Sequence, residues 1–197
     1  MPTTWESLIN TGAPWQTASG TTLNTAATAT ISPEGAGGTG ADPQVFSFYQ
    51  GMAVRVKARG VYTCGSTATN ATFILRASAT GTALSGGTTL ATTGALALPT
   101  SVTNLFWELE ALIQCRAMAQ GTGTATLYTH GALLLQTATW SSPTGNVGIW
   151  PMPATAGPTA ADVDTTITHT VGLTGTLSQN TGTPAITCTN FLVEAVD

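Results

Sequence analysis

The feature that most restricts how this chain folds is a two-residue alternation of apolar and polar side chains, which recurs from Gln44 to the C-terminus. In the clearest example, which starts at Leu105, every second side chain is apolar and most of those between are polar or charged. Successive side chains of a β-strand point to opposite faces, so this period indicates strands that pack on one face and meet solvent on the other. Threonine, about a fifth of the chain, suits such strands because its branched side chain fits a pleated surface.

Four segments define the side chains that we expect to face the core. They are Met52, Val54, Val56, Ala58 and Tyr62; Ala71, Phe73, Leu75 and Ala77; Trp107, Leu109, Ala111, Ile113, Cys115 and Ala117; and Ala125, Leu127, Gly131, Leu133 and Leu135. A regular alternation from Val163 to Leu177 predicts one further strand, with His169 on its apolar side.

The last segment, from Ala185 to Val196, differs because apolar residues occupy both of its expected faces. These are Ile186, Cys188 and Leu192 on one face, and Phe191 and Val193 on the other. Such a pattern is typical of a strand that is buried on both sides. Between Thr139 and Ala160 the chain contains four prolines, which cannot donate a hydrogen bond to a central strand, so we expect a long ordered loop there.

These patterns together predict the fold class and the domain organisation. About eight strands with turn residues at short intervals favour an all-β fold with two antiparallel sheets, and we expect a jelly-roll sandwich. The 197 residues suffice for one sizeable domain. We expect an extended N-terminal arm with a glycine-rich hinge over residues 1–43 and the jelly-roll domain over residues 44–197. The capping-box spacing of Thr3 and Glu6 predicts a short helical turn from Trp5 to Ile9.

The arm carries apolar residues that are costly to leave in water: Trp5, Leu8, Ile9 and Trp15. A tryptophan can bury about 150–250 Å². The two tryptophans either fold back on their own domain, dock on a neighbouring subunit or contact a ligand. We take these four residues as the predicted anchor for a protein partner.

The small number of charged residues limits the kinds of molecule that this protein is expected to bind. Only 7% of the residues are charged, the net charge is −4, and five residues are basic. This composition provides no basic surface for a phosphate backbone, so we expect no nucleic-acid partner. No apolar run approaches the length of a membrane span, and the N-terminus lacks the layout of a secretory signal. We therefore expect no membrane partner, and synthesis and assembly in a cytoplasm.

Few side chains are suited to catalysis or metal binding. We expect His130 on the surface and His169 in the core or an interface, and a metal site would need help from Asp162 or Asp164. No nucleophile elbow or P-loop occurs, and the glycine-rich stretch of residues 35–40 lacks the lysine of a phosphate site. We expect no metal, no cofactor and no enzymatic activity.

The three cysteines, Cys64, Cys115 and Cys188, cannot all pair within one chain. None of them belongs to a C-x-x-C pair, and a disulfide scaffold would contain more cysteines. We therefore expect buried free thiols.

One group of charged residues has a regular spacing. Glu108 and Glu110 emerge on one face of a strand about 7 Å apart, which in isolation would suit a glycosidase pair. Arg55, Lys57 and Arg59 form a matching basic row on another strand. Because opposed charges on neighbouring strands commonly pair, we expect a cross-strand or intersubunit charge ladder instead.

The surface also predicts self-association. Long strands that are rich in threonine and poor in lysine leave sheet edges that would pair with other chains. We expect copies of the same chain to cover these edges in a closed symmetric ring.

Several segments carry a resemblance to a known group of proteins: residues 51–60 (GMAVRVKARG), 72–76 (TFILR), 106–116 (FWELEALIQCR), 123–127 (GTATL) and Gly131. This pattern resembles the jelly-roll structural proteins encoded near the capsid and tail genes of phages that infect actinobacteria. Those proteins are similar in fold to trimers of the tumour-necrosis-factor type. The resemblance covers roughly residues 44–136 and, more loosely, 163–196.

The resemblance implies a non-enzymatic role in a virion. We expect a capsid decoration protein, exposed on the outside of the particle, that binds the major capsid protein as a homotrimer. The alternative is a host-recognition head of the tail or baseplate. In that case the proline-rich loop, with Trp140, Asn146 and Trp150, would be a surface for a glycan or a protein partner.

Overall fold

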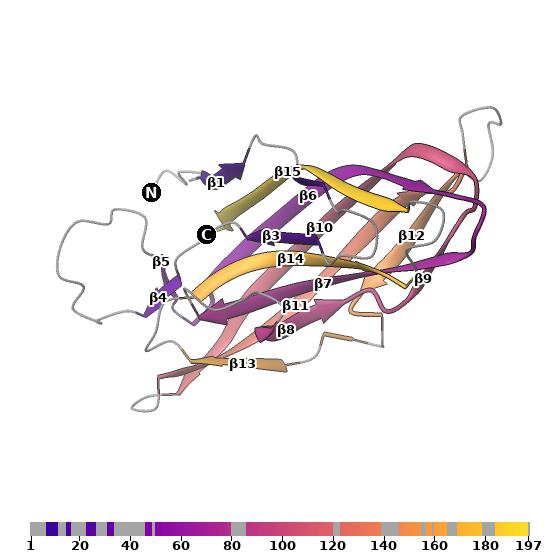
Figure 1. The fold of residues 1–197 in the computed structure, drawn as a ribbon. Helices are drawn as coiled ribbons and strands as arrows, with labels where there is room; N and C mark the ends of the chain where they lie inside the picture. The colour runs from indigo at the N-terminus through magenta and orange to yellow at the C-terminus, as the bar shows by residue number, and fades with distance from the viewer. Residues whose placement is uncertain are drawn as a thin grey trace.

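The computed structural model describes residues 50–79, 86–119, 123–138, 146–154, 157–158, 160–164, 169–178 and 184–196, together with the backbone of five short strands before residue 50. In these parts two β-sheets pack face to face as a sandwich (Figure 1). All the strand pairs are antiparallel except one between two short strands. The predicted all-β fold of two packed antiparallel sheets is therefore confirmed.

The larger sheet holds most of the long strands. Its order is β15 (Ala185–Val196), β6 (Ala53–Cys64), β10 (Val102–Ala119), β11 (Thr124–Gln136) and β12 (Val147–Met152), with β13 (Ala160–Asp164) also on β11, and β1 (Ser7–Thr11) and β2 (Trp15–Gln16) on β15.

The smaller sheet covers the inner face of the larger one. It contains β14 (His169–Leu177), β7 (Thr69–Ala79), β8 (Thr88–Thr92) and β9 (Leu96–Leu98), with β3 (Leu23–Ala26) and β4 (Ile31–Pro33) on β14, and β5 (Phe46–Phe48) parallel to β4. The chain crosses between the sheets from β2 to β3, from β5 to β6, from β6 to β7, from β9 to β10, from β13 to β14 and from β14 to β15.

The core lies between the sheets, and nearly all the predicted inward residues are buried there. At its centre the indole of Trp107 is 0% exposed and lies 5.0 Å from the ring of Phe73, between centroids. The Nε1–H of Trp107 donates a hydrogen bond of 3.2 Å to the carbonyl oxygen of Thr187. The period-two pattern therefore predicted the core because the pleat places alternate side chains on one face.

Two β-bulges correct the predicted faces. The register between β10 and β11 shifts between Cys115 and Ala117, and as a result Ala117 is exposed rather than buried. The register between β15 and β6 shifts between Cys188 and Asn190, so Phe191 is buried on the same side as Cys188. The prediction that β15 is buried on both faces is therefore wrong, because an extra residue in a bulge changes the phase of the alternation.

The proline-rich segment is not entirely a loop. Residues Val147–Met152 form β12, an edge strand of the larger sheet that includes Pro151. The prediction of a loop is wrong for these six residues, although the exclusion of a central strand is confirmed. An edge strand tolerates proline because its outer backbone groups need no partner in the ladder.

The segment from Val163 to Leu177 forms two strands instead of one. β13 pairs with β11 in the larger sheet, whereas β14 pairs with β7 in the smaller sheet. The prediction of a single strand is wrong because the alternation continues on both sides of a crossover between the sheets. Side-chain periodicity reports which residues face inward, not which sheet they join.

The arm contributes backbone strands to the edges of both sheets. β1 and β2 pair with β15, and β3 and β4 pair with β14. The predicted helical turn is wrong for residues 7–9, which belong to strand β1. Trp5 lies outside the described residues, as do the side chains of Leu8, Ile9 and Trp15.

No helix among the described residues is long and apolar enough to cross a membrane.

Candidate functional site

The predicted charge ladder lies on the side of the larger sheet that faces away from the core. We call this surface the outer sheet face. It consists of Asn190, Leu192 and Glu194 on β15; Arg55, Lys57 and Arg59 on β6; Glu108, Glu110 and Leu112 on β10; His130, Ala132 and Leu134 on β11; and Ile149 and Pro151 on β12. All of these residues are exposed or half-buried.

Strand register arranges the residues of β15, β6 and β10 in rows across the sheet. Arg59 lies between Asn190 and Glu108. In the next row Lys57 lies between Leu192 and Glu110. The basic residues of β6 are thus directly beside the acidic residues of β10, as the spacing of these residues predicted.

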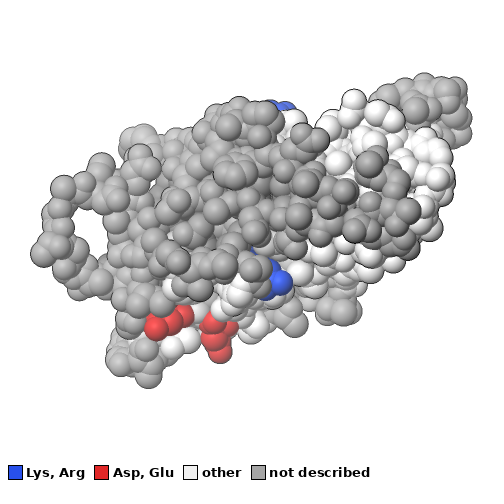
Figure 2. Space-filling model, in the orientation of Figure 1, with Lys and Arg blue, Asp and Glu red and all other residues white. Residues whose placement is uncertain are grey.

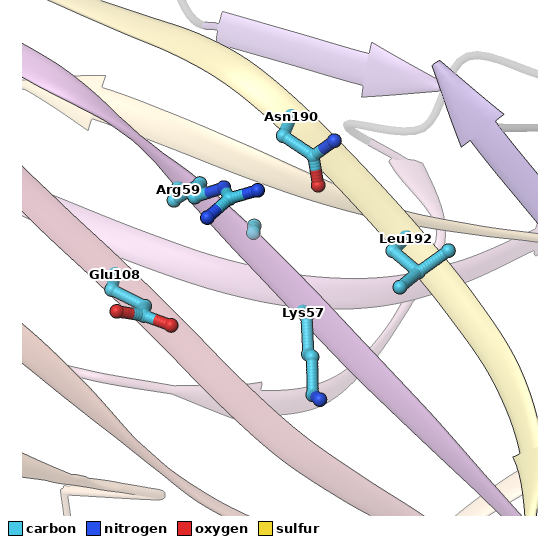
Figure 3. Close-up of a pocket in the computed structure, with 6 residues that line it drawn as sticks. Lys57, Arg59, Glu108, Asn190 and Leu192 are labelled. Carbon is cyan, nitrogen blue, oxygen red and sulfur yellow. The ribbon is translucent and has the colours of Figure 1, made fainter. Parts of the chain in front are cut away.

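A hollow opens on this face at the bulge of β15 (Figure 3). Its volume is about 280 Å³, and its lining residues are Lys57, Ala58, Arg59, Glu108, Asn190 and Leu192. Asn190 and Leu192 reach it only because the bulge turns them outward. Sequence reasoning missed both residues, and the only signal was a polar asparagine within an apolar run.

The charges of the ladder are only partly paired. Nε of Arg55 lies 3.4 Å from Oε1 of Glu110, with side chains 29% and 55% exposed. An ion pair this exposed contributes at most about 1 kcal/mol. In the part of the chain that the structure describes, the side chains of Lys57, Arg59 and Glu108 make no ion pair. The ladder therefore retains unpaired charges of both signs.

An apolar border adjoins the charged rows. Ile149 is 69% exposed and lies opposite the half-buried Leu134, and Pro151 lies opposite Ala132. A large exposed apolar side chain next to other apolar groups is typical of a protein-binding surface. Figure 2 shows the opposite side of the molecule, that of the smaller sheet, where the described residues include few charged side chains and acidic groups gather near β13.

Of the three predicted loop residues, the structure describes Asn146 and Trp150. Trp150 lies opposite the buried Leu133 and is half-buried against the core. Its ring covers Gly148 so closely that a Cβ there would lie 2.0 Å from Cη2 of Trp150. The backbone oxygen of Asn146 accepts a hydrogen bond of 2.7 Å from the N–H of Thr137. Trp140 lies outside the described residues.

The histidines lie in different environments, as predicted. His130 is exposed beside a second hollow of about 230 Å³, whereas His169 is 6% exposed. Nε2 of His169 donates to the carbonyl oxygen of Asp164, and Asp162 instead accepts a hydrogen bond of 2.8 Å from Thr126. The described residues include no group of three or more His, Cys, Asp or Glu side chains that could hold a metal ion.

All three thiols are free and buried, which confirms the prediction. Burial raises the pKa of each, because a thiolate loses its hydration in the core. The effect is largest for Cys188, whose pKa rises from 9.0 to about 11. Its Sγ lies 3.2 Å from the carbonyl oxygen of Asn190, within the bulge that shapes the hollow.

The raised pKa of Cys188 predicts a loss of stability in alkali. The unfolded chain releases this proton near pH 9 and the folded chain only near pH 11, so the free energy of unfolding falls as pH rises between these values. Urea titrations at pH 8, 9, 10 and 11 measure this slope. Cys188→Ala is expected to make the slope shallower than in the parent chain, and an unchanged slope would contradict the assignment.

Comparison of the chain with protein-family models, with curated proteins and with solved structures found no match.

Proposed function

We propose that this chain is a structural protein of a bacteriophage particle, and specifically a decoration protein that binds the major capsid protein on the outside of the shell. It acts as an oligomer, for which the resemblance of its strand segments implies a trimer. It performs no catalysis and works through contacts between protein surfaces.

The observation that carries this proposal is the outer sheet face. It offers a broad sheet surface with exposed apolar groups such as Ile149 beside partly unpaired charges. Such a surface fits a protein partner, because apolar contacts supply affinity while charges select register. A shell protein present in many copies can also rely on modest single contacts that add through multivalency.

The jelly-roll assignment belongs to this proposal. The repeated crossings between the sheets support it, since a jelly roll winds its strands across two sheets. The meander of β10, β11 and β12 within one sheet departs from a regular jelly roll.

The arm is proposed to anchor the protein on the shell, and this predicts a separable loss of binding. The full-length chain with Trp5→Ala and Trp15→Ala is expected to bind purified empty capsids at least about tenfold more weakly, because aromatic anchors dominate protein interfaces. Co-sedimentation with capsids measures the affinity, and a deletion of residues 1–40 is a more severe second test.

Trp150→Ala serves as the matched control, since it changes the same residue type outside the arm. Unchanged capsid binding by the double variant would contradict the anchor. Absence of capsid binding by the parent chain, together with binding to host cells or glycans that Trp150→Ala abolishes, would favour the alternative host-recognition head.

A further inference from the structure

In the rows that join β15, β6 and β10 on the outer sheet face, the charges are balanced and ordered. The three basic residues of β6 are matched by three acidic residues: Glu108, Glu110 and Glu194. A partner whose surface carries one sign of charge would be attracted by the charged residues of one strand and repelled by those of the other. The best electrostatic match is a surface with one line of acidic residues opposite the basic residues of β6 and one line of basic residues opposite the acidic residues of β10.

A second copy of the same face has this property. The second copy is rotated by 180° about an axis that runs parallel to the strands, above the outer sheet face and midway between β6 and β10. Each row of residues across the sheet then keeps its position along the strands, whereas β6 and β10 exchange places. Lys57 then faces Glu110 of the second copy, and Arg59 faces Glu108 of the second copy. The rotation makes each of these contacts twice, because a two-fold interface is self-complementary.

The outer strands match in the same arrangement. Because β15 and β11 also exchange places, Leu192 faces Ala132 of the second copy. In the next row Glu194 faces His130 of the second copy. Leu192 and Ala132 thus form an apolar contact and Glu194 meets a histidine, whereas Asn190 faces Leu134 and Arg55 faces Leu112 of the second copy.

We propose that a second copy of this chain packs on the outer sheet face about this two-fold axis. The inference deepens the self-association in the proposed function and rests on it, but it names the surface and the symmetry. It is compatible with a trimer, since two trimers joined in this way form a hexamer. Lys57 and Arg59 of β6 are available for the contact because they make no ion pair within the described part of their own chain.

The area of the face is sufficient for a stable contact. The four strands from β15 to β11 overlap about this axis; at a spacing of about 4.8 Å they give a width of about 19 Å, and ten residues of strand give a length of about 33 Å. The resulting area of about 630 Å² per copy lies at the lower end of the range for specific interfaces. The hollow at the bulge of β15 lies within this area and is lined by Lys57 and Arg59 (Figure 3).

Charge reversal tests the inference with the purified full-length chain. One double variant, Lys57→Glu with Arg59→Glu, makes positions 57, 59, 108 and 110 all acidic. The other, Glu108→Lys with Glu110→Lys, makes the same four positions all basic. Light scattering after size-exclusion chromatography is expected to find an even number of copies for the parent and half that number for each double variant. An equimolar mixture of the two double variants is expected to regain the copy number of the parent.

Two further variants separate the contact from folding and from general charge effects. Arg116→Glu reverses an exposed charge outside the rows and is expected to keep the copy number of the parent. Leu192→Arg places a cation opposite Ala132 of the second copy. It is expected to halve the copy number without altering the charged residues of β6 and β10. An odd copy number for the parent, or double variants that keep the parental number, would overturn the inference.

The same proteins separate this inference from the proposed function. If the copy number halves as expected but the parent does not bind capsids, the inference holds and the decoration function fails. If the parent binds capsids but charge reversal leaves the copy number unchanged, the inference alone fails.

Discussion

Replacing Trp107 with alanine is expected to lower the free energy of unfolding by about 3–5 kcal/mol, the range for removing a large aromatic side chain from a core. The indole is fully buried, packs against Phe73 of the opposite sheet and donates its only N–H to Thr187 of β15. Alanine would leave a cavity between the sheets and would remove the hydrogen bond to the carbonyl oxygen of Thr187. Few substitutions elsewhere in the described core remove as many contacts at once.

Urea denaturation followed by circular dichroism measures this effect. Trp107→Phe is the matched control, because it keeps an aromatic ring against Phe73 but cannot donate to Thr187. We expect it to cost less than the alanine variant, although more than about 1 kcal/mol, because it loses both volume and a hydrogen bond. A loss below about 1 kcal/mol for Trp107→Ala would contradict the central position of this residue.

Replacing Gly60 with alanine is expected to destabilise the chain by about 3 kcal/mol or more, at or above the upper end of the range for overpacking. A Cβ at this position would lie 1.8 Å from the carbonyl oxygen of Thr187 and 2.9 Å from Cα of Cys188. Both contacts are with backbone, which cannot move aside as a flexible side chain could. β15 would therefore have to separate from β6 at the bulge.

Gly86→Ala provides the control for this prediction, because a Cβ on Gly86 would meet nothing within 4 Å. We expect that variant to unfold within about 0.5 kcal/mol of the parent. Thermal and urea denaturation of both variants make the comparison. Equal stability of Gly60→Ala and Gly86→Ala would show that β15 does not approach β6 as closely as described.

The close approach at Gly60 also connects the core to the outer sheet face. The bulge that follows Cys188 turns Asn190 and Leu192 outward, where they line the hollow with Lys57 and Arg59. A residue with a Cβ at position 60 is therefore expected to disturb this hollow as well as the stability. In this way a single glycine positions part of the candidate binding surface.

Local periodicity identified most of the long strands and most of the buried residues, because the pleat converts a sequence spacing of two into a common face. It also placed Arg55, Lys57 and Arg59 on one face and Glu108 with Glu110 on another strand. It failed where the phase of the alternation changed, at the bulges that expose Ala117 and turn Leu192 outward. A bulge inserts one residue whose presence depends on the partner strand, so no local pattern reveals it.

The sequence by itself determined that this chain is a β-protein with an apolar interior, free buried thiols and two charged rows, since these properties depend on residue type and spacing. Only the tertiary structure decided which strands become neighbours, how β13 and β14 divide between the sheets, and that β6 lies between β15 and β10. Strand pairing joins residues far apart in the chain, such as Arg59 and Glu108 or Arg59 and Asn190, and their register arises from packing and bulges. The composition of the outer sheet face is therefore a property of the fold, although each of its residues is visible in the sequence.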